Sequence, residues 1–296
     1  MEDMMTESMI GCGRQAVDMI IDEGTFQENS VGSHTFDPDY GPAAVVGTAK
    51  IDGTESTVIA IDAQAFNDRF PVVYLGVIGL EEAYKMASAV YETMEADKAK
   101  KPGEKRPIVL IVDTPGNAPG KVEEIVGMNK ATGAYQLALA EARRCGHPVV
   151  AMVIGRAISG AFLCHGLQAD HILALSKEYG TTIHVMPITS ISRITKIEID
   201  RLEVLAKDNP VFASGVDFFY KLGGVEEIVS KPDDMKEAVR RHVSEITQLK
   251  LSGNTETLGP SGRGILGASR KGRTTRARTI SMMEAEFDEV AEKYLS

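Results

Sequence analysis

The sequence contains few cysteines and no long apolar run. Cys12, Cys145 and Cys164 form no C-x-x-C pair, so we expect neither a disulfide framework nor a structural zinc site. The longest apolar runs, such as residues 149–154, are far shorter than the ~18 residues that a membrane span requires. The opening residues place acidic side chains before any basic one, so no signal peptide is expected. These absences predict a cytoplasmic chain with reduced thiols and no membrane span.

An excess of acidic residues limits the classes of partner. The 296 residues include 32 Lys and Arg against 42 Asp and Glu, which gives a net charge of −10. A protein that binds nucleic acid over its whole surface is therefore not expected, although a local basic patch remains open. With 43% hydrophobic and 25% charged residues, the composition is that of an ordinary globular chain. The length fits about two domains or one large α/β unit.

Strand-like apolar runs alternate with helical patterns in the centre of the chain. Residues 108–112 and 149–154 are continuous apolar runs, which is typical of strands buried on both faces. A long helical pattern follows over residues 121–144, and a turn and helix follow within residues 155–169, before a third strand at 172–175. The alternation predicts a right-handed βαβ arrangement with ligand chemistry at the carboxyl ends of the strands.

The flanking segments are assigned from the same patterns. We expect further helices, two short strands joined by an Asp-Gly turn, and a region near the C-terminus without apolar periodicity. The helices are expected over residues 14–22, 80–100, 192–207, 233–251 and 282–295, and the two strands over 45–51 and 57–62. The sequence thus predicts one domain over residues 1–251, a flexible or partner-ordered basic Gly/Ser/Arg-rich segment over 252–281, and a C-terminal helix over 282–296.

Three patterns that suggest other chemistry each lack a required residue or spacing. GNAPGKV (residues 116–122) is one residue short of a phosphate loop and has Val122 where Mg²⁺ requires a hydroxyl. RAISGA (residues 156–161) has Ala157 at the first glycine position of a nucleophile elbow. The six histidines include no H-x-x-x-H pair. We therefore expect no nucleotide hydrolysis, no catalytic triad and no metal.

Two glycine-containing turns remain as candidates for anion binding. Residues 115–117 (Pro-Gly-Asn) and 159–161 (Ser-Gly-Ala) each follow a predicted buried strand and each precede a helix. Backbone N–H groups at a helix start have no partner within the helix, and the helix dipole favours negative charge there. Two such turns side by side would hold a developing oxyanion from two directions. The equally weighted alternative is that both glycines only permit close packing of a helix on a strand.

A cluster of basic residues stands out from the acidic chain. Six cations and no acid lie within 16 residues, at Arg263, Arg270, Lys271, Arg273, Arg276 and Arg278. One interpretation is a solvated tail. The other is a docking surface for an acidic partner or for a phosphorylated cofactor arm.

Several segments resemble a known family. DTPGNAPG (residues 113–120) and PVVAMVIGRAISGAFLCHGLQADHILAL (148–175) are similar to the carboxyltransferase subunits of acyl-CoA carboxylases. Four segments look most like the gamma subunit of malonate decarboxylase, namely RAISGAFLCHGLQA (156–169), IHVM (183–186), SRITKIEIDRLEVLAKDNP (192–210) and FFYKLGGVEEIV (218–229). The resemblance covers residues 106–230 well, and RQAVDMIIDEGTFQE (14–28) is similar to the opening of carboxyltransferase domains in general.

The resemblance implies a fold, an activity and partners. The expected fold is α/β, a crotonase-like (ClpP/crotonase) spiral of ββα units of the carboxyltransferase type. The expected activity is that of a subunit that acts with a beta subunit to decarboxylate a malonyl thioester, with CO2 released or passed to biotin. The thioester is carried by an acyl carrier protein with a CoA-derived prosthetic arm, and no cofactor is expected on this chain itself. A hetero-oligomer whose site lies at the subunit interface is therefore expected.

The resemblance also implies site residues, carried over position by position. Gly116 and Asn117 match the first turn, and Ser159, Gly160 and Ala161 match the second. Their backbone amides are the expected anion contacts, because loss of a carboxyl group from a thioester leaves an enolate whose oxygen needs N–H donors.

Side-chain contacts and alternative functions complete the expectations. Arg156 and His165 are expected to contact the substrate, and Arg273, Arg276 and Arg278 are expected to bind a partner. One alternative is the alpha-type carboxyltransferase subunit of an acetyl- or propionyl-CoA carboxylase. An alternative of another class is a non-catalytic scaffold that docks the carrier protein through its basic segment.

Overall fold

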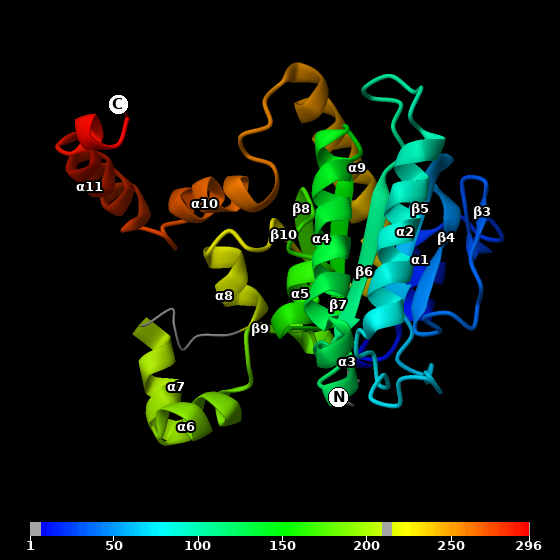
Figure 1. Cartoon of the computed structure of the whole chain (residues 1–296), viewed down its shortest axis with the longest axis horizontal. Helices are drawn as coiled ribbons and strands as arrows, with labels where there is room; N and C mark the ends of the chain where they lie inside the picture. The colour runs from blue at the N-terminus through cyan, green and yellow to red at the C-terminus, as the bar shows by residue number, and fades with distance from the viewer. Residues whose placement is uncertain (1–6, 209–214, 296) are drawn as a thin grey trace, which may run out of the picture.

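A single mixed sheet forms the centre of the computed structural model, which describes residues 7–208 and 215–295 (Figure 1). The strand order is β1-β4-β5-β6-β7-β8-β10, and β9 pairs with the end of β7. The pairs β1–β4 and β4–β5 are antiparallel, and the other pairs are parallel. The strands are β1 Gln27–Glu28, β4 Ala44–Ile51, β5 Thr54–Ile61, β6 Ile108–Thr114, β7 Val149–Ile158, β8 His171–Leu175, β9 Thr182–His184 and β10 Glu227–Val229, and a separate hairpin joins β2 Ser30–Val31 to β3 His34–Thr35.

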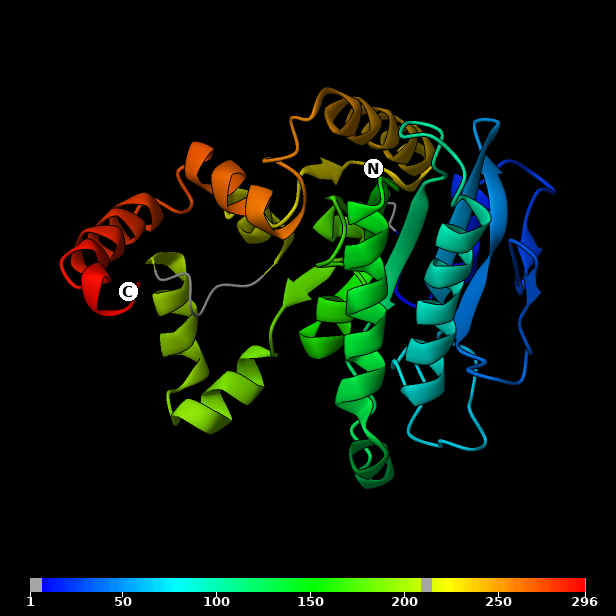
Figure 2. The same ribbon diagram turned by 45° about the horizontal axis from the view of Figure 1, so that its top comes forward.

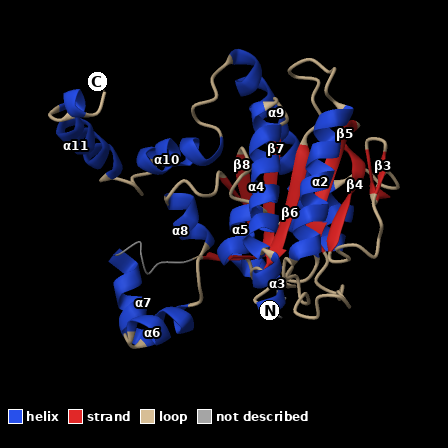
Figure 3. Ribbon diagram, in the orientation of Figure 1, coloured by secondary structure: helices blue, strands red, loops and turns tan. Residues whose placement is uncertain are grey.

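Helices cover both faces of the sheet and give three layers (Figures 2 and 3). α2 and α4 pack side by side on one face, and α1 and α9 pack on the other. The helices are α1 Gly13–Ile20, α2 Leu80–Ala96, α3 Lys121–Val126, α4 Met128–Arg144, α5 Ser159–Cys164, α6 Ile188–Thr195, α7 Ile199–Asp208, α8 Val216–Lys221, α9 Met235–Ser252, α10 Gly259–Ser269 and α11 Arg276–Asp288. No helix in the described part of the chain is both long and apolar enough to cross a bilayer.

The continuous apolar runs are explained by the two cores. Successive side chains of a strand point to opposite faces, so a strand covered on both faces needs apolar residues at every position. Leu110 of β6 packs in the cluster beneath α2 and α4, whereas its neighbour Ile111 packs in the cluster beneath α1 and α9. The expected strands in this region are therefore confirmed, as is the Asp52-Gly53 turn, where both residues have a positive φ.

Two of the expected helices are each divided by a residue in the left-handed region. Residues 121–144 form α3 and α4, which are separated by Gly127 with φ 117°. The segment expected as a helix over 192–207 forms α6 and α7, and Lys196 at the end of α6 has φ 60°. A left-handed residue ends a helix and redirects the chain, so the prediction of one continuous helix is wrong in both places.

The basic segment is folded into helices, which corrects the expectation of a flexible segment over residues 252–281. α10 lies inside it, and α11 begins at Arg276, earlier than expected. Arg263 is buried and its guanidinium donates to the carbonyls of Leu167 (2.7 Å) and Ala169 (2.5 Å). Gly and Ser are poor helix formers, so contacts outside α10 are needed to fix this helix.

Arg270 makes the second anchor of this segment. It donates to the carbonyl of Tyr220 in α8 (2.6 Å) and to the carbonyls of Val225 (2.6 Å) and Glu226 (2.8 Å) in the turn between α8 and β10. Its guanidinium also stacks 3.6 Å from the centre of the Tyr220 ring. Arginines that the sequence suggested for docking therefore hold the C-terminal segment against the body, while α11 projects to the side (Figure 1).

We expect Arg270→Ala to lower the free energy of unfolding by about 2 kcal/mol, because three carbonyls lose a charged donor. Amide hydrogen exchange of residues 259–269 should become faster in this variant. Arg278→Ala is the matched control, since Arg278 is exposed and its loss should change stability by less than about 0.5 kcal/mol. Equal urea midpoints for the two variants would contradict the anchoring role.

Candidate active site

The candidate site lies where β6 and β7 end. The two strands are parallel, so their carboxyl ends lie at the same edge of the sheet. From these ends the chain turns through residues 115–120 into α3 and through Ser159 into α5 (Figure 2). In open parallel sheets ligands bind at this edge. The two turns predicted from sequence are therefore brought to one place.

A buried ion pair joins the two strand ends. Asp113 is 2% exposed. Its Oδ1 accepts hydrogen bonds from the backbone N–H (2.7 Å) and Nε (2.9 Å) of Arg156, and its Oδ2 accepts from Nη2 of Arg156 (2.9 Å) and from the N–H of Gly11 (2.7 Å). Nη2 of Arg156 also donates to the carbonyl of Leu75 (2.9 Å). The pair thus connects β6, β7, the N-terminal segment and the loop before α2.

This geometry changes the role expected for Arg156. The guanidinium that was expected on the substrate carboxylate is already bound in two places by the carboxylate of Asp113. Its positive charge is neutralised there, so we assign Arg156 to positioning the two strand ends instead. The sequence analysis missed Asp113. Its signal was an acidic residue directly after the apolar run of β6.

Glycines make room for this ion pair. A Cβ on Gly155 would lie 2.5 Å from Oδ1 of Asp113, and one on Gly76 would lie 3.2 Å from Nη2 of Arg156. Gly76 also has φ 88°, a conformation that side chains rarely adopt. Both positions therefore require glycine for the arginine and the carboxylate to meet.

The two glycine turns are in direct contact. The N–H of Ile78 donates to the carbonyl of Gly116 (3.0 Å), and the N–H of Ala118 donates to the carbonyl of Ile78 (2.8 Å), which fixes the first turn against the loop before α2. A Cβ on Gly160 would lie only 2.7 Å from Nδ2 of Asn117. The Asn117 side chain therefore rests on the second turn, and its Oδ1 is buried with no hydrogen-bond partner among the described residues.

The backbone amides of the second turn begin α5. Ser159 has φ 55°, a strained conformation for a residue with a side chain, at the point where β7 passes into the helix. Gly160 and Ala161 follow in the first turn of α5, where N–H groups have no carbonyl to bind within the helix. Such amides and the helix dipole favour an anion.

The amides differ in how accessible they are. Ser159 is exposed, and Asn117 and Gly160 are partly exposed, whereas Gly116 and Ala161 are buried. The N–H of Gly116 also makes a long hydrogen bond, 3.4 Å, to Oγ1 of Thr114 in its own turn. Of the five residues predicted to contact an anion, Asn117, Ser159 and Gly160 are therefore the three that are at least partly exposed.

His165 lies inside the core, which corrects its expected contact with substrate. Its ring is fully buried, with Nδ1 2.9 Å from the hydroxyl of Tyr135 and Nε2 2.9 Å from the carbonyl of Ile111. Burial lowers the pKa of His165 to about 4, so the ring is neutral at neutral pH. Because a carbonyl only accepts, Nε2 carries the proton and Nδ1 accepts from Tyr135.

The site offers no activated nucleophile among the described residues. Cys164 of α5 is buried, and desolvation raises the pKa of its thiol to about 12, so it is not a thiolate at neutral pH. No hydrogen bond joins the Ser159 hydroxyl to a histidine in the described part of the chain. Backbone amides that bind negative charge remain as the candidate chemistry.

Apolar side chains next to the site are left uncovered. On α3, which directly follows the first turn, Val122, Ile125 and Val126 are 59%, 73% and 59% exposed. Leu163 of α5 is also exposed. Adjacent exposed apolar residues indicate a surface that another protein covers.

The basic residues expected at a partner divide into two groups. Arg273 is partly exposed, and its Nε donates to the carbonyl of Leu222 (2.8 Å). Arg276 and Arg278 lie on α11 and are exposed. They are the two members of the predicted set whose positions leave them open to a partner.

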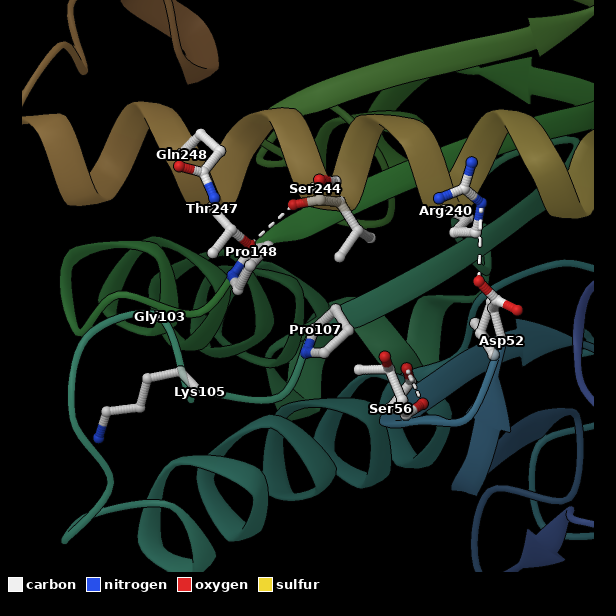
Figure 4. A pocket seen from close by; sticks show the side chains of 13 residues that line it. Asp52, Ser56, Gly103, Lys105, Pro107, Pro148, Arg240, Ser244, Thr247 and Gln248 are labelled. Carbon is white, nitrogen blue, oxygen red and sulfur yellow. Dashed lines mark hydrogen bonds and ion pairs between the residues drawn. The ribbon is translucent and has the colours of Figure 1, made fainter.

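A pocket of ≈ 320 Å³ lies at the opposite edge of the sheet (Figure 4). Pro107 and Pro148 line it and directly precede β6 and β7, so the pocket lies at the amino ends of these strands. Figure 4 shows an ion pair between Arg240 and Asp52 (3.8 Å) beside it. Because ligands of parallel sheets bind at the carboxyl ends, we do not assign this pocket to the reaction.

Comparisons with known proteins agree with one another. The family model described as the malonate decarboxylase gamma subunit matches residues 75–286. A malonyl-S-ACP:biotin-protein carboxyltransferase from Malonomonas rubra is 62% identical over 290 residues, which cover 98% of this chain and 99% of that protein. The acetyl-coenzyme A carboxylase carboxyl transferase subunit alpha of Methylococcus capsulatus is 27% identical over 80% of this chain and 71% of that protein.

A solved structure supports the same relationship. A chain of the Pseudomonas malonate decarboxylase hetero-tetramer in complex with coenzyme A matches with a TM-score of 0.73 and 28% identity, over 92% of this chain and 98% of that one. The expected carboxyltransferase-type, crotonase-like fold is thereby confirmed.

The buried state of His165 predicts a pH dependence of stability. The unfolded ring takes up a proton near pH 6.5, whereas the folded ring resists protonation to about pH 4. The contribution of His165 to the free energy of unfolding is therefore complete above pH 6.5. It is lost as the pH falls toward 4, and the total loss is about 3 kcal/mol. We expect urea unfolding to show that wild type loses more stability than His165→Gln between pH 7.5 and pH 5. Parallel losses in the two proteins would contradict a buried neutral ring.

Proposed function

The chain belongs to the malonate decarboxylase gamma-subunit family, and from this premise we propose that it transfers the carboxyl group of a malonyl thioester from an acyl carrier protein to a biotin protein. The observation that carries this choice is 62% identity, over nearly the whole of both chains, to the malonyl-S-ACP:biotin-protein carboxyltransferase. Identity to the malonate decarboxylase chain is 28%, and identity to the acetyl-CoA carboxylase subunit is 27%. Direct release of CO2 and acetyl-CoA carboxylation therefore rank lower.

The reaction needs stabilisation of negative charge and no side-chain nucleophile. When the bond between the α-carbon and the carboxyl group breaks, its electron pair passes to the thioester as an enolate. The enolate oxygen gains negative charge and is stabilised by fixed N–H donors. The departing carboxylate loses its charge, so neutral donors suit it because they orient it without binding it tightly. We place the departing carboxyl group on this chain and the enolate oxygen mainly on the partner subunit.

The donors that we propose for this chain are the amides of Asn117, Ser159 and Gly160. They come from two touching turns, and we propose that they face one region. The neutralisation of Arg156 by Asp113 also suits this reaction. A free guanidinium bound to the substrate carboxylate would stabilise the bound substrate and slow the loss of its carboxyl group. The ion pair with Asp113 instead fixes the turns that hold the amides.

A beta subunit is the partner proposed to complete the site. A solved Pseudomonas malonate decarboxylase contains two different chains in a hetero-dimer. On this chain the exposed Val122, Ile125 and Val126 of α3 lie directly after the first turn, where a covering subunit would exclude water from the site. We propose that this chain contributes half of an interfacial site.

The carrier protein is proposed to dock at α11. Arg276 and Arg278 are exposed there, and α11 projects beside the body of the protein (Figure 1). The CoA-derived arm of the carrier is anionic, which suits these cations. Biotin would arrive on its own protein, so this chain would hold no cofactor of its own.

The test combines this chain, its beta partner and an acyl carrier protein that bears a malonyl thioester. The free carboxyl carbon of the malonyl group is labelled with ¹⁴C. We expect label to appear in the biotin protein only when both subunits are present. Malonyl-CoA in place of the malonyl carrier should react poorly.

Three outcomes would contradict the proposal. CO2 release at the same rate without the biotin protein would favour a biotin-independent decarboxylase. Equal use of malonyl-CoA would favour an acyl-CoA carboxylase subunit. Carboxyl transfer at the full rate in the absence of this chain would show that the chain takes no part in catalysis.

We expect Gly160→Ala to lower the rate of carboxyl transfer by at least about tenfold, because the new Cβ displaces Asn117 and crowds the amides, and a lost donor costs up to about 10²–10³ in rate. Assembly with the beta subunit should be unchanged by gel filtration. Gly133→Ala, on an exposed site of α4 where a Cβ meets nothing within 4 Å, is the matched control. Full activity of Gly160→Ala would favour the scaffold alternative.

A further inference from the structure

Two buried histidines that lie 71 residues apart in the sequence meet at the edge of β8. His171 begins β8 and His242 lies in the middle of α9, which crosses this end of the sheet. Their exposed fractions are both 5%. The two Nδ1 atoms face each other at 2.8 Å. This arrangement brings two nitrogen ligands together, and neither the turns nor the ion pair of the candidate active site uses them.

A carboxylate lies beside the two nitrogens. Oε2 of Glu245, one turn further along α9, is 3.8 Å from Nδ1 of His242. The ligand atoms of His171, His242 and Glu245 all lie within 4.8 Å of one another. Ligand atoms of a tetrahedral Zn²⁺ at ~2.0–2.2 Å are roughly 3.3–3.6 Å apart. The separations of 2.8 Å and 3.8 Å need changes of about half an ångström. The third separation, of up to 4.8 Å, requires the exposed Glu245 side chain to move by roughly 1.3 Å.

A second carboxylate contacts the other nitrogen of the His242 ring. Its Nε2 lies 2.8 Å from Oε2 of Glu227, the first residue of β10. A carboxylate only accepts, so Nε2 carries the proton and the lone pair of Nδ1 points toward His171. A carboxylate behind a histidine is the usual support of a metal-bound imidazole, because it fixes the tautomer and the ring orientation.

The cluster opens to a pocket of ≈ 410 Å³ between α9 and α10. His171, His242 and Glu245 line it together with Leu249, Ile265 and Ser269. Glu245 is exposed, so an ion has a path from solvent. The pocket leaves room for water as a fourth ligand.

We propose that His171, His242 and Glu245 bind a divalent transition-metal ion, with Zn²⁺ as the ion that suits two imidazoles and one carboxylate. The spacing of these residues in the sequence gives no metal motif, which is why the sequence predicts no metal. The site lies at the opposite edge of the sheet from the candidate active site, because His171 pairs with Val150 at the start of β7. The ion therefore joins α9 to the sheet and takes no part in carboxyl transfer.

The test measures Zn²⁺ binding to the full-length chain in a Cys145→Ser background, since Cys145 is an exposed free thiol and thiolates are zinc ligands. The chain is first stripped with chelator. Competition with a chromogenic zinc chelator then gives affinity and stoichiometry, and Co²⁺ reports the ligand set through its visible absorption. We expect one bound ion, a raised Tm with Zn²⁺, and no response to Mg²⁺, which prefers oxygen ligands.

Variants separate a metal site from a simple hydrogen-bonded pair. Glu245→Gln removes a ligand at an exposed position and should weaken zinc binding at least tenfold. Glu227→Gln removes the support of His242 and should weaken it about 10- to 100-fold. Glu237→Gln is the matched control, because Glu237 lies on the same helix, is exposed and, among the residues that the structure describes, forms an ion pair only with Arg240.

Equal zinc affinity of the Glu245 and Glu237 variants would overturn the proposal, as would a chain whose Tm and Co²⁺ spectrum do not respond to metal. In that case the two histidines form only a hydrogen bond. These results are independent of the carboxyl-transfer assay, so either proposal can fail alone.

Discussion

The buried ion pair between Asp113 and Arg156 is the interaction on which the arrangement of the candidate site depends. An aspartate that is 2% exposed is stable only because four hydrogen bonds satisfy its two oxygens. Losing one partner of such a pair costs about 3–5 kcal/mol, since the other charge is left buried. The donors come from β7 and from the N-terminal segment, so the pair fixes elements that are distant in the sequence. The two turns are held in register by this connection.

The consequence for the proposed site is that backbone amides carry it. Ser159 keeps a left-handed conformation, and Asn117 rests against Gly160, because the surrounding strands determine both positions. Fixed amides suit a reaction in which charge develops and disperses, since they need no reorganisation when the bond breaks. The exposed side chains of α3 beside these amides fit a site that a second subunit completes. A half site of this kind needs neither a deep pocket nor a reactive side chain of its own.

Local patterns predicted the central elements well, and they failed where contacts at a distance decide. The continuous apolar run of β6 predicts a strand that is covered on both faces, and the Asp52-Gly53 pair predicts the hairpin between β4 and β5. By contrast, Gly127 ends α3 where the apolar pattern predicts a continuous helix. The prediction fails there because apolar spacing does not indicate which residue adopts a left-handed conformation. Residues 259–269 have weak helix propensity, yet they are helical because Arg263 and Arg270 bind carbonyls elsewhere in the chain. The family itself could be recognised from the motifs alone, since these carry residue identities.

The sequence by itself determined the alternation of strands and helices, the two glycine turns at the ends of adjacent strands and the resemblance to carboxyltransferases. Only the tertiary structure decided which side chains are free to act. It buries His165 between Tyr135 and Ile111, neutralises Arg156 with Asp113, and brings His171 to His242. The physical reason is that hydrogen bonds and burial depend on distance in space. Apolar periodicity reports only which face of an element is covered.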